Sequence, residues 1–337
     1  MDIKERLFLL SNADGVGNIT CASDLAYNML KEICPAKRQN NLTVMGFLKG
    51  KKDYTLMLDA HIDQIAMVVT NVDDNGFLTV ENAGGIDIRA LPSRRVTVYG
   101  KEKISAVFCA TPPHLSKGTE EFDSISKIKL DTALGKKANK LISVGDYVTF
   151  DTSASDLLEN RVCGKSFDDR AAVACLIEVA SRLKGEKLPF NVAFLLSDSE
   201  ELGMRGVRTA TFEINPQEAI AVDVGFGDGI GISPEECGKL QGGGMVGISP
   251  TLDSRISNKL IKLAKKAEIP YQTEVMSSTT GTNADMISLT SQGVPTGTLS
   301  IPIRNMHTDC EILDLCDLDA VCDLLCEYIL SGGVMND

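Results

Sequence analysis

The second half of the chain alternates between short apolar runs and longer segments whose apolar residues recur at helical spacing. Runs of strand length lie at residues 190–196, 219–224, 271–276 and 296–301. Segments with helical spacing lie at residues 169–184, 254–267, 284–292 and 318–330. Because continuously apolar strands that alternate with helices are buried on both sides, this pattern predicts an α/β fold whose mostly parallel sheet is covered by helices on both faces.

The first 67 residues add helices and strands of the same kind. Two helical segments flank a polar loop at residues 12–18, which contains the turn formers Gly15 and Gly17. Apolar runs at residues 42–47 and 54–58 predict two neighbouring strands. We therefore expect residues 1–67 and 153–337 to form one discontinuous α/β domain.

Residues 68–152 interrupt this pattern with short β-type pieces and frequent turns. Strands are predicted at residues 95–100 and 104–109, and the Lys- and Glu-rich stretch 117–137 predicts an exposed loop with a short helix. We expect a small inserted β domain that serves assembly and substrate access rather than chemistry. His114 lies in this insert, and we expect it to have a structural or loop role.

Composition and charge narrow the class of protein. The 337 residues are 43% hydrophobic, enough for a sizeable core, and the net charge of −12 argues against a nucleic-acid or anionic-membrane partner. The N-terminus carries no charged-then-apolar leader, and no apolar run is long enough to cross a bilayer. The ten cysteines form no short C-x-x-C pair, and we expect most of them to be buried free thiols. These features predict a cytoplasmic location.

Acidic residues and scarce histidines stand where apolar strands end or helices begin. The chain has only three histidines, and two of them belong to this set. The set comprises His61, Asp63, Asp168, Asp169, Glu200, Glu201, Asp223 and His307. Each member alone has an ordinary structural explanation, such as a helix cap or a solvated acidic loop. Because ligands of α/β sheets bind at the carboxyl ends of the strands, we expect the set to converge there.

Two imidazoles with three or four carboxylates are suited to two divalent ions bridged by one carboxylate and one water. Zinc, cobalt and manganese all accept such ligands. Of the adjacent glutamates Glu200 and Glu201, one can then bind metal while the other takes a proton from the bridging water. In the H-x-D triplet, Asp63 can accept a hydrogen bond from one nitrogen of His61 and present the other to a metal. The set therefore predicts a hydrolase site.

Five segments, in this order, resemble those of the dinuclear metallo-aminopeptidases of the glutamyl and tetrahedral aminopeptidase family, some of which were once labelled cellulases. They are AHIDQIAMVV, GKSFDDRAAV, SDSEELGMRG, AIAVDVG and IPIRNMHTDCE. The resemblance covers nearly the whole chain, including the insert with its NAGGIDIRAL segment. It implies a zinc-exopeptidase-like fold and the removal of N-terminal residues from peptide substrates.

The resemblance also implies roles for individual residues. Five of them would bind two divalent ions per chain, with zinc or cobalt favoured over manganese: His61, Asp168, Glu201, Asp223 and His307. Asp168 would bridge the ions, Glu200 would be the general base, and Asp63 would orient His61. Members with such an insert form hollow homo-oligomers, which implies a homo-oligomer here, with a dodecamer as one form.

Two positions depart from the usual family pattern, and two other functions compete with the peptidase. Gln64 stands where an acid is common, and Asn305 stands where an aromatic residue is common. A glycoside hydrolase could use two of the carboxylates, but it would need no metal and would leave both site histidines without a function. A catalytically silent binding protein on the same fold is the other alternative, although a complete ligand set argues against it.

Overall fold

The computed structural model describes residues 1–39, 42–112, 114–115 and 124–336. In this part of the chain an eight-stranded sheet forms the centre of the larger lobe, with the strand order β1-β2-β12-β3-β13-β16-β14-β15. Its strands are β1 (Ala36–Arg38), β2 (Val44–Leu48), β12 (Phe190–Ser197), β3 (Lys52–His61), β13 (Glu218–Phe226), β16 (Thr296–Ile303), β14 (Gly244–Ile248) and β15 (Tyr271–Val275). The adjacent strands β12, β3, β13 and β16 run parallel, and β1, β2 and the β16–β14 pair add antiparallel contacts.

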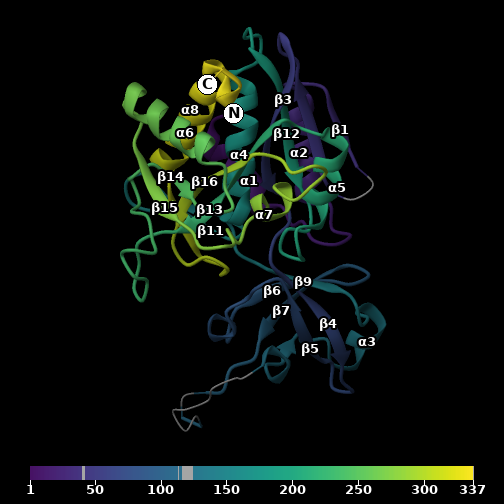
Figure 1. Cartoon of the computed structure of the whole chain (residues 1–337). Helices are drawn as coiled ribbons and strands as arrows, with labels where there is room; N and C mark the ends of the chain where they lie inside the picture. The colour runs from purple at the N-terminus through teal and green to yellow at the C-terminus, as the bar shows by residue number, and fades with distance from the viewer. Residues whose placement is uncertain (40–41, 113, 116–123, 337) are drawn as a thin grey trace.

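Helices cover both faces of this sheet (Figure 1). Along β3, Leu56 and Leu58 pack into one core cluster, while Met57 between them packs into the cluster on the opposite face. The first cluster is covered by α1 (Ile3–Asn12), α2 (Cys21–Lys31), α4 (Phe167–Arg182), α6 (Ser254–Ala267) and α8 (Leu315–Ser331). The opposite face is covered by α5 (Arg205–Ile214) and α7 (Ala284–Ile287). The predicted fold class, a mostly parallel sheet between two helical layers, is confirmed.

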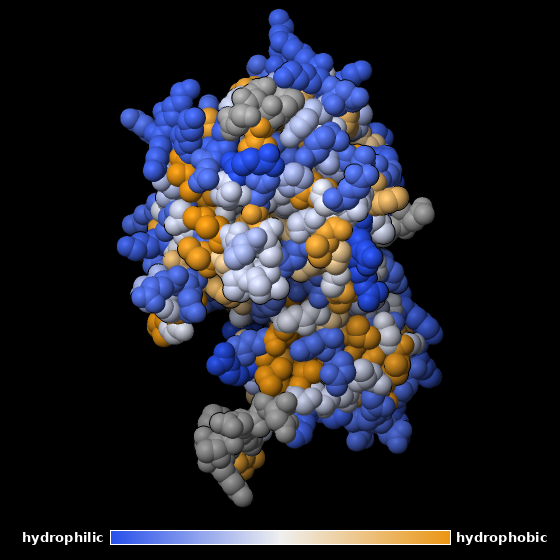
Figure 2. All heavy atoms as spheres, in the orientation of Figure 1, coloured by the Kyte–Doolittle hydropathy of each residue, from blue (hydrophilic) through white to orange (hydrophobic). Residues whose placement is uncertain are grey.

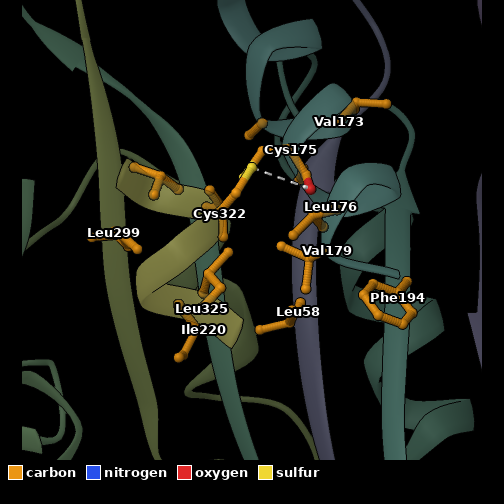
Figure 3. Packing of buried hydrophobic residues seen from close by; sticks show 14 of the residues in the cluster. Leu58, Val173, Cys175, Leu176, Val179, Phe194, Ile220, Leu299, Cys322 and Leu325 are labelled. Atoms are coloured by element: carbon orange, nitrogen blue, oxygen red, sulfur yellow. Dashed lines mark hydrogen bonds between the residues drawn. The ribbon is translucent and has the colours of Figure 1, made fainter. Parts of the chain in front are cut away.

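Helices α4 and α8 pack against each other in the first cluster, and Figure 3 shows this contact. Leu176 and Val179 of α4 and Leu325 of α8 are fully buried. The sulfur atoms of Cys175 and Cys322 lie 3.0 Å apart between the helices. The first turn of α4 carries Asp168 and Asp169, so the dense apolar packing of this helix fixes the position of both residues in the site.

Several sequence predictions need correction. β2 and β3 are not neighbours, because β12 pairs with both and lies between them. The helix predicted at residues 284–292 is the short α7, since Ser288, Thr290 and Gly293 form turns after it. Helix α5 was not predicted, because the glycines before it indicate a loop. All ten cysteines are free, as predicted. Only Cys34, Cys175 and Cys322 are buried, so the prediction that most of them would be buried is wrong.

The smaller lobe is a closed barrel with the strand order β4-β5-β8-β7-β6-β9 (Figure 1). Its strands are β4 (Ala66–Val72), β5 (Phe77–Ala83), β8 (Leu130–Asp131), β7 (Lys103–Phe108), β6 (Arg95–Tyr99) and β9 (Tyr147–Phe150). Alternate residues such as Val96 and Val98 fill its interior. Short helices accompany it: η1 (Ile88–Ala90), η2 (Ile125–Lys127), η3 (Gly135–Lys137) and α3 (Ala138–Leu141). The barrel agrees with the predicted inserted β domain of the fold class.

Within the stretch predicted as an exposed loop with a short helix, residues 117–123 lie outside the described residues. The remainder also contains strand β8, which closes the barrel between β5 and β7, so part of it is not a loop. His114 is exposed in a turn, as expected for a loop residue.

A small antiparallel sheet joins two segments that carry site residues. It consists of β10 (Ser155–Asp156), β11 (Arg161–Gly164) and β17 (Glu311–Asp314), and the short helix η4 (Gly333–Asn336) follows α8. Gly164 of β11 pairs with Glu311 of β17. This pairing brings the start of α4 beside the segment that follows β16.

The surface is mainly hydrophilic over the larger lobe, and hydrophobic residues gather on the visible face of the barrel (Figure 2). Among the described residues, no helix has the length and apolar character that a membrane crossing requires.

Candidate metal and catalytic site

The ends of four parallel strands bring the predicted site residues together. His61 is the last residue of β3, and Ser197, the last of β12, is its partner in the sheet register. The turn after β12 carries Glu200 and Glu201. Asp223 lies on β13 beside Ser300 of β16. Because all four strands end at the same edge, their side chains and the loops that follow them meet there.

Asp168 lies between the two histidines. Its Oδ1 is 2.9 Å from Nε2 of His61, and its Oδ2 is 3.2 Å from Nε2 of His307. One oxygen therefore faces each imidazole, which is the arrangement that a bridging carboxylate requires. Nε2 of His307 also lies 3.5 Å from Oε1 of Glu201, and Nε2 of His61 lies 4.0 Å from Oδ1 of Asp223.

Among the described residues, two groups offer ligand atoms within 4.8 Å of one another: His61 with Asp168 and Glu201, and His61 with Asp169 and Asp223. Asp169 has other partners as well. Its Oδ2 accepts a hydrogen bond from the backbone N–H of His61 at 3.1 Å, and its Oδ1 accepts one from Ala172 at 3.4 Å. Helix capping therefore accounts for Asp169 and leaves Asp168 directed at the histidines.

Asp63 lies beneath His61 and the two glutamates. Its Oδ1 is 3.5 Å from Nδ1 of His61, and that nitrogen has no hydrogen-bond partner within the described part of the chain. The same carboxylate accepts hydrogen bonds from the backbone N–H groups of Glu200 at 3.0 Å and Glu201 at 3.2 Å. Asp63 thus anchors the turn that carries both glutamates, which the H-x-D spacing did not predict.

Negative charge exceeds positive charge in this buried cluster. Burial, reinforced by Asp168, raises the pKa of Glu201 to about 8, and burial raises the pKa of Asp223 well above its usual range. The hydrogen bond to Asp168 raises the pKa of His307 to about 9. Carboxylates and imidazoles that hold protons in this way exchange them for divalent cations, since cations remove the repulsion that keeps the protons bound. The donor set therefore fits divalent metal ions.

Glu311 was not predicted as a site residue. It is buried, its Oε2 accepts a hydrogen bond from the backbone N–H of Asp168 at 3.1 Å, and its Oε1 accepts one from His307 at 2.9 Å. It fixes the backbone of two predicted ligands at once. The signal in the sequence was its position in the IPIRNMHTDCE segment, four residues after His307 and at the start of a strand.

Asp59 is a second buried carboxylate that the sequence did not single out. Its Oδ2 accepts a hydrogen bond from Nδ2 of Asn283 at 2.7 Å, and the same amide donates to Oγ of Ser197 at 2.9 Å. Burial raises the pKa of Asp59 to about 7. Asn283 therefore links β3, β12 and the loop before α7 below the site.

Both departures from the family pattern have local partners. Oε1 of Gln64 accepts a hydrogen bond from the N–H of Gly15 at 3.2 Å and lies 3.4 Å from Nη2 of the buried Arg170. Asn305 has a left-handed backbone with φ of 58°, a conformation that Asn adopts more readily than an aromatic residue. Its Nδ2 donates to the carbonyl of Cys310 at 3.1 Å. Neither departure removes a predicted ligand.

The barrel also contributes to the edge of the site. A Cβ added to Gly85 would lie 2.8 Å from Nδ1 of His307, and one added to Gly84 would lie 3.0 Å from Oε2 of Glu201. Gly84 also has a positive φ of 95°, which favours glycine. The segment after β5 therefore passes directly beside two predicted ligands, and only glycine allows this approach.

Together these features define an α/β protein with buried His, Asp and Glu side chains that offer metal ligands at the carboxyl ends of its parallel strands. The family model for M42 glutamyl aminopeptidase matches residues 43–324, and the chain belongs to this family. Family membership supports a peptide hydrolase.

Relatives and solved structures agree with this assignment. The chain is 30% identical to the lysyl aminopeptidase of Pyrococcus furiosus over 309 residues, covering 88% of this chain and 87% of that protein. Its structure is similar to that of aminopeptidase APDkam598 from the archaeon Desulfurococcus kamchatkensis, with a TM-score of 0.91, 28% identity and coverage of 98% and 95% of the two chains. It is also similar to the Pyrococcus horikoshii TET1 peptidase, which can assemble into a tetrahedron or a large octahedral shell, with a TM-score of 0.86, 26% identity and coverage of 98% and 99%.

Proposed function

We propose that the chain is an aminopeptidase that removes N-terminal residues from peptides and depends on two divalent ions. The observation that carries this proposal is Asp168, with one carboxylate oxygen facing His61 and the other facing His307. Two divalent ions, when bound, supply the positive charge that polarises a scissile carbonyl and makes water acidic.

The ligands divide into two sets that share Asp168. His61 and Asp223 would hold one ion with Asp168, and Glu201 and His307 would hold the other. Nitrogen and carboxylate ligands of this kind favour zinc or cobalt and also accept manganese. Asp63 lies against the second nitrogen of His61, so it would keep the ring oriented.

Glu200 would act as the general base that takes a proton from the attacking water and passes it to the leaving amine. Its backbone N–H donates a hydrogen bond to Asp63, and its side chain does not belong to the proposed ligand set. Burial raises the pKa of Glu200 above its ordinary value, which brings it nearer to neutral pH. A base with such a pKa can both accept and return the proton.

We also propose a homo-oligomer in the cytoplasm, in which residues 68–152 form an inserted domain that serves assembly and access to the site. A dodecamer is the form that a closed tetrahedral assembly of identical chains would give. The similarity to the TET1 peptidase supports assembly, as do Val107 and Val144, which are exposed on the barrel. Ten free cysteines support a reducing compartment.

The test compares a peptide with a free N-terminus, the same peptide with an acetylated N-terminus, and a cellulose oligosaccharide. We expect release of the first residue from the free peptide only, and loss of this activity after treatment with a chelator. Cleavage of the oligosaccharide that resists the chelator would favour the glycoside hydrolase. Binding of peptides without turnover in any metal would favour the silent binding protein.

A further inference from the structure

A cavity is lined by residues of β13, β14 and β15 and of the loops that follow β13 and β15. Its volume is about 500 Å³, within the range of about 300 to 1,000 Å³ typical of small-molecule sites. The residues that matter most for its chemistry are Phe226, Ile232, Glu235, Glu236, Met245 and Glu274. Its walls are thus partly apolar and partly acidic.

Two elements connect the cavity with the proposed catalytic site. Phe226, on its wall, is three residues beyond Asp223 on the same strand. Thr280 lines the cavity from the loop after β15, and Asn283, three residues later, donates to Asp59 below the site. One strand and one loop therefore run from the cavity wall to the site.

Glu274 is the acidic residue held inside the cavity, whereas Glu235 and Glu236 are exposed. Its Oε2 accepts a hydrogen bond from Oγ of Ser300 at 2.8 Å, and Ser300 is the sheet partner of Asp223. Oε1 of Glu274 has no hydrogen-bond partner among the described residues. A Cβ on Gly225 would lie 2.9 Å from this oxygen, so glycine there leaves room for the carboxylate.

The charge of Glu274 is not balanced by the protein. Among the described residues that line the cavity there is no Lys, Arg or His. Burial raises the pKa of Glu274, and the hydrogen bond from Ser300 offsets this only in part. A partly buried carboxylate without a cationic partner gains most from a ligand that brings a positive charge.

We propose that this cavity receives the side chain of the substrate's N-terminal residue, and that Glu274 makes the enzyme select lysine or arginine there. This inference rests on the proposed aminopeptidase function. The alkyl part of a lysine or arginine side chain would lie along Phe226, Ile232 and Met245, and its charged end would meet Glu274. An N-terminal glutamate or aspartate would be repelled by the same carboxylate.

The experiment compares kcat/KM for lysyl and norleucyl amides of the same fluorogenic amine, because the two side chains differ at the cationic end and have similar alkyl stems. For the unaltered protein we expect the lysyl amide to be favoured by about tenfold to a hundredfold, as for a hydrogen bond to a charged group. Glutamyl amide should be the poorest substrate of the panel.

In Glu274→Gln the preference for lysyl over norleucyl amide should fall to about onefold to threefold, since most of the charge interaction is removed. Turnover of the norleucyl amide should be retained, which shows that the variant is folded and its catalytic site intact. Glu102→Gln, an exposed change in the turn between β6 and β7, is the matched control and should leave the preference unchanged.

Equal turnover of lysyl and norleucyl amides by the unaltered protein would overturn the inference, as would a lysyl preference that survives Glu274→Gln. Either result would leave the proposed aminopeptidase intact, because activity would still be measured. Absence of activity on every amide, with metal supplied, would instead refute the proposed function.

Discussion

Individual side chains in the site depend on hydrogen bonds from residues that do not belong to the predicted ligand set. Asp63 holds the backbone of Glu200 and Glu201, and Glu311 holds the backbone of Asp168 and His307. Both are buried carboxylates that accept two backbone N–H groups each. Such partners fix the direction of a ligand, and losing one weakens metal binding without removing any ligand atom.

The two adjacent glutamates should differ when each is changed separately. Glu200→Gln should retain its metal and lower kcat by about 10²- to 10⁴-fold, the loss typical of a missing general base. Glu201→Gln should instead bind metal more weakly, because the amide is a poorer ligand than the carboxylate. Metal content and turnover of both variants, measured together at saturating metal, check this. Loss of metal from Glu200→Gln alone would mean that the roles are reversed.

Changing Glu311 should weaken metal binding although Glu311 itself is not proposed as a ligand. In Glu311→Gln only one side-chain oxygen can accept a hydrogen bond, so one of two backbone N–H groups loses its partner. We expect metal affinity to fall about 10- to 100-fold, measured by competition with a chromophoric chelator. Glu327→Gln, an exposed change on α8, should have no effect. An unchanged affinity in Glu311→Gln would contradict this positioning role.

At the scale of single residues, the predicted ligands could be identified from the sequence more readily than the residues that hydrogen-bond to them. His61, Asp168 and His307 could be predicted because strand ends, scarce histidines and the family resemblance all indicate them. Glu311 and Asp59 were missed because one partner of each, Asp168 and Asn283, lies far away in the sequence. These partners come close only when β17 pairs with β11 and when the loop before α7 crosses below the strands.

Helix α4 is the element on which the site depends most, because Asp168 lies in its first turn while most of the helix is buried and packs against α8 and β3 (Figure 3). The alternation of strands and helices predicted this helix and the four parallel strands. It did not predict α5 or the position of β12 between β2 and β3. Glycines before α5 favour a loop locally, and strand order depends on contacts between distant segments.

A cavity in the contact between α4 and α8 should destabilise the whole lobe. Leu176 is fully buried, so Leu176→Ala should lower the free energy of unfolding by about 2 to 5 kcal/mol. Leu330→Ala, near the end of α8 where the side chain is 48% exposed, should change it by less than about 0.5 kcal/mol. Urea unfolding at equal metal content measures both. Equal effects of the two changes would show that packing in this contact does not support the lobe.

The whole molecule combines the cluster of predicted ligands on the larger lobe with a barrel whose Gly84 and Gly85 pass beside Glu201 and His307. The insert was expected to serve assembly and substrate access rather than chemistry, and its backbone borders the site. Sequence patterns indicated the barrel but not the close approach of Gly84 and Gly85 to the site. Glycine carries no functional group, and these two glycines matter because a Cβ atom at either position would crowd Glu201 or His307.

We expect the protein to form a homo-oligomer in solution, with the mass of a dodecamer as the leading form. The reason is the exposed apolar surface on the barrel together with the similarity to an assembling peptidase (Figure 2). Light scattering coupled to size-exclusion chromatography gives the mass. A strict monomer that hydrolyses short peptides at a normal rate would rule out a role of the barrel in assembly.

The central claim is that two divalent ions convert this cluster into a peptidase. Its most direct test is to remove metal with a chelator, add zinc or cobalt stepwise, and measure bound ions per chain and turnover of an aminoacyl amide in the same samples. We predict that tight metal binding saturates at about two ions per chain and that turnover reaches its maximum at the same stoichiometry. Full activity in metal-free protein would contradict the account, as would a protein that is saturated with metal but does not hydrolyse the amide.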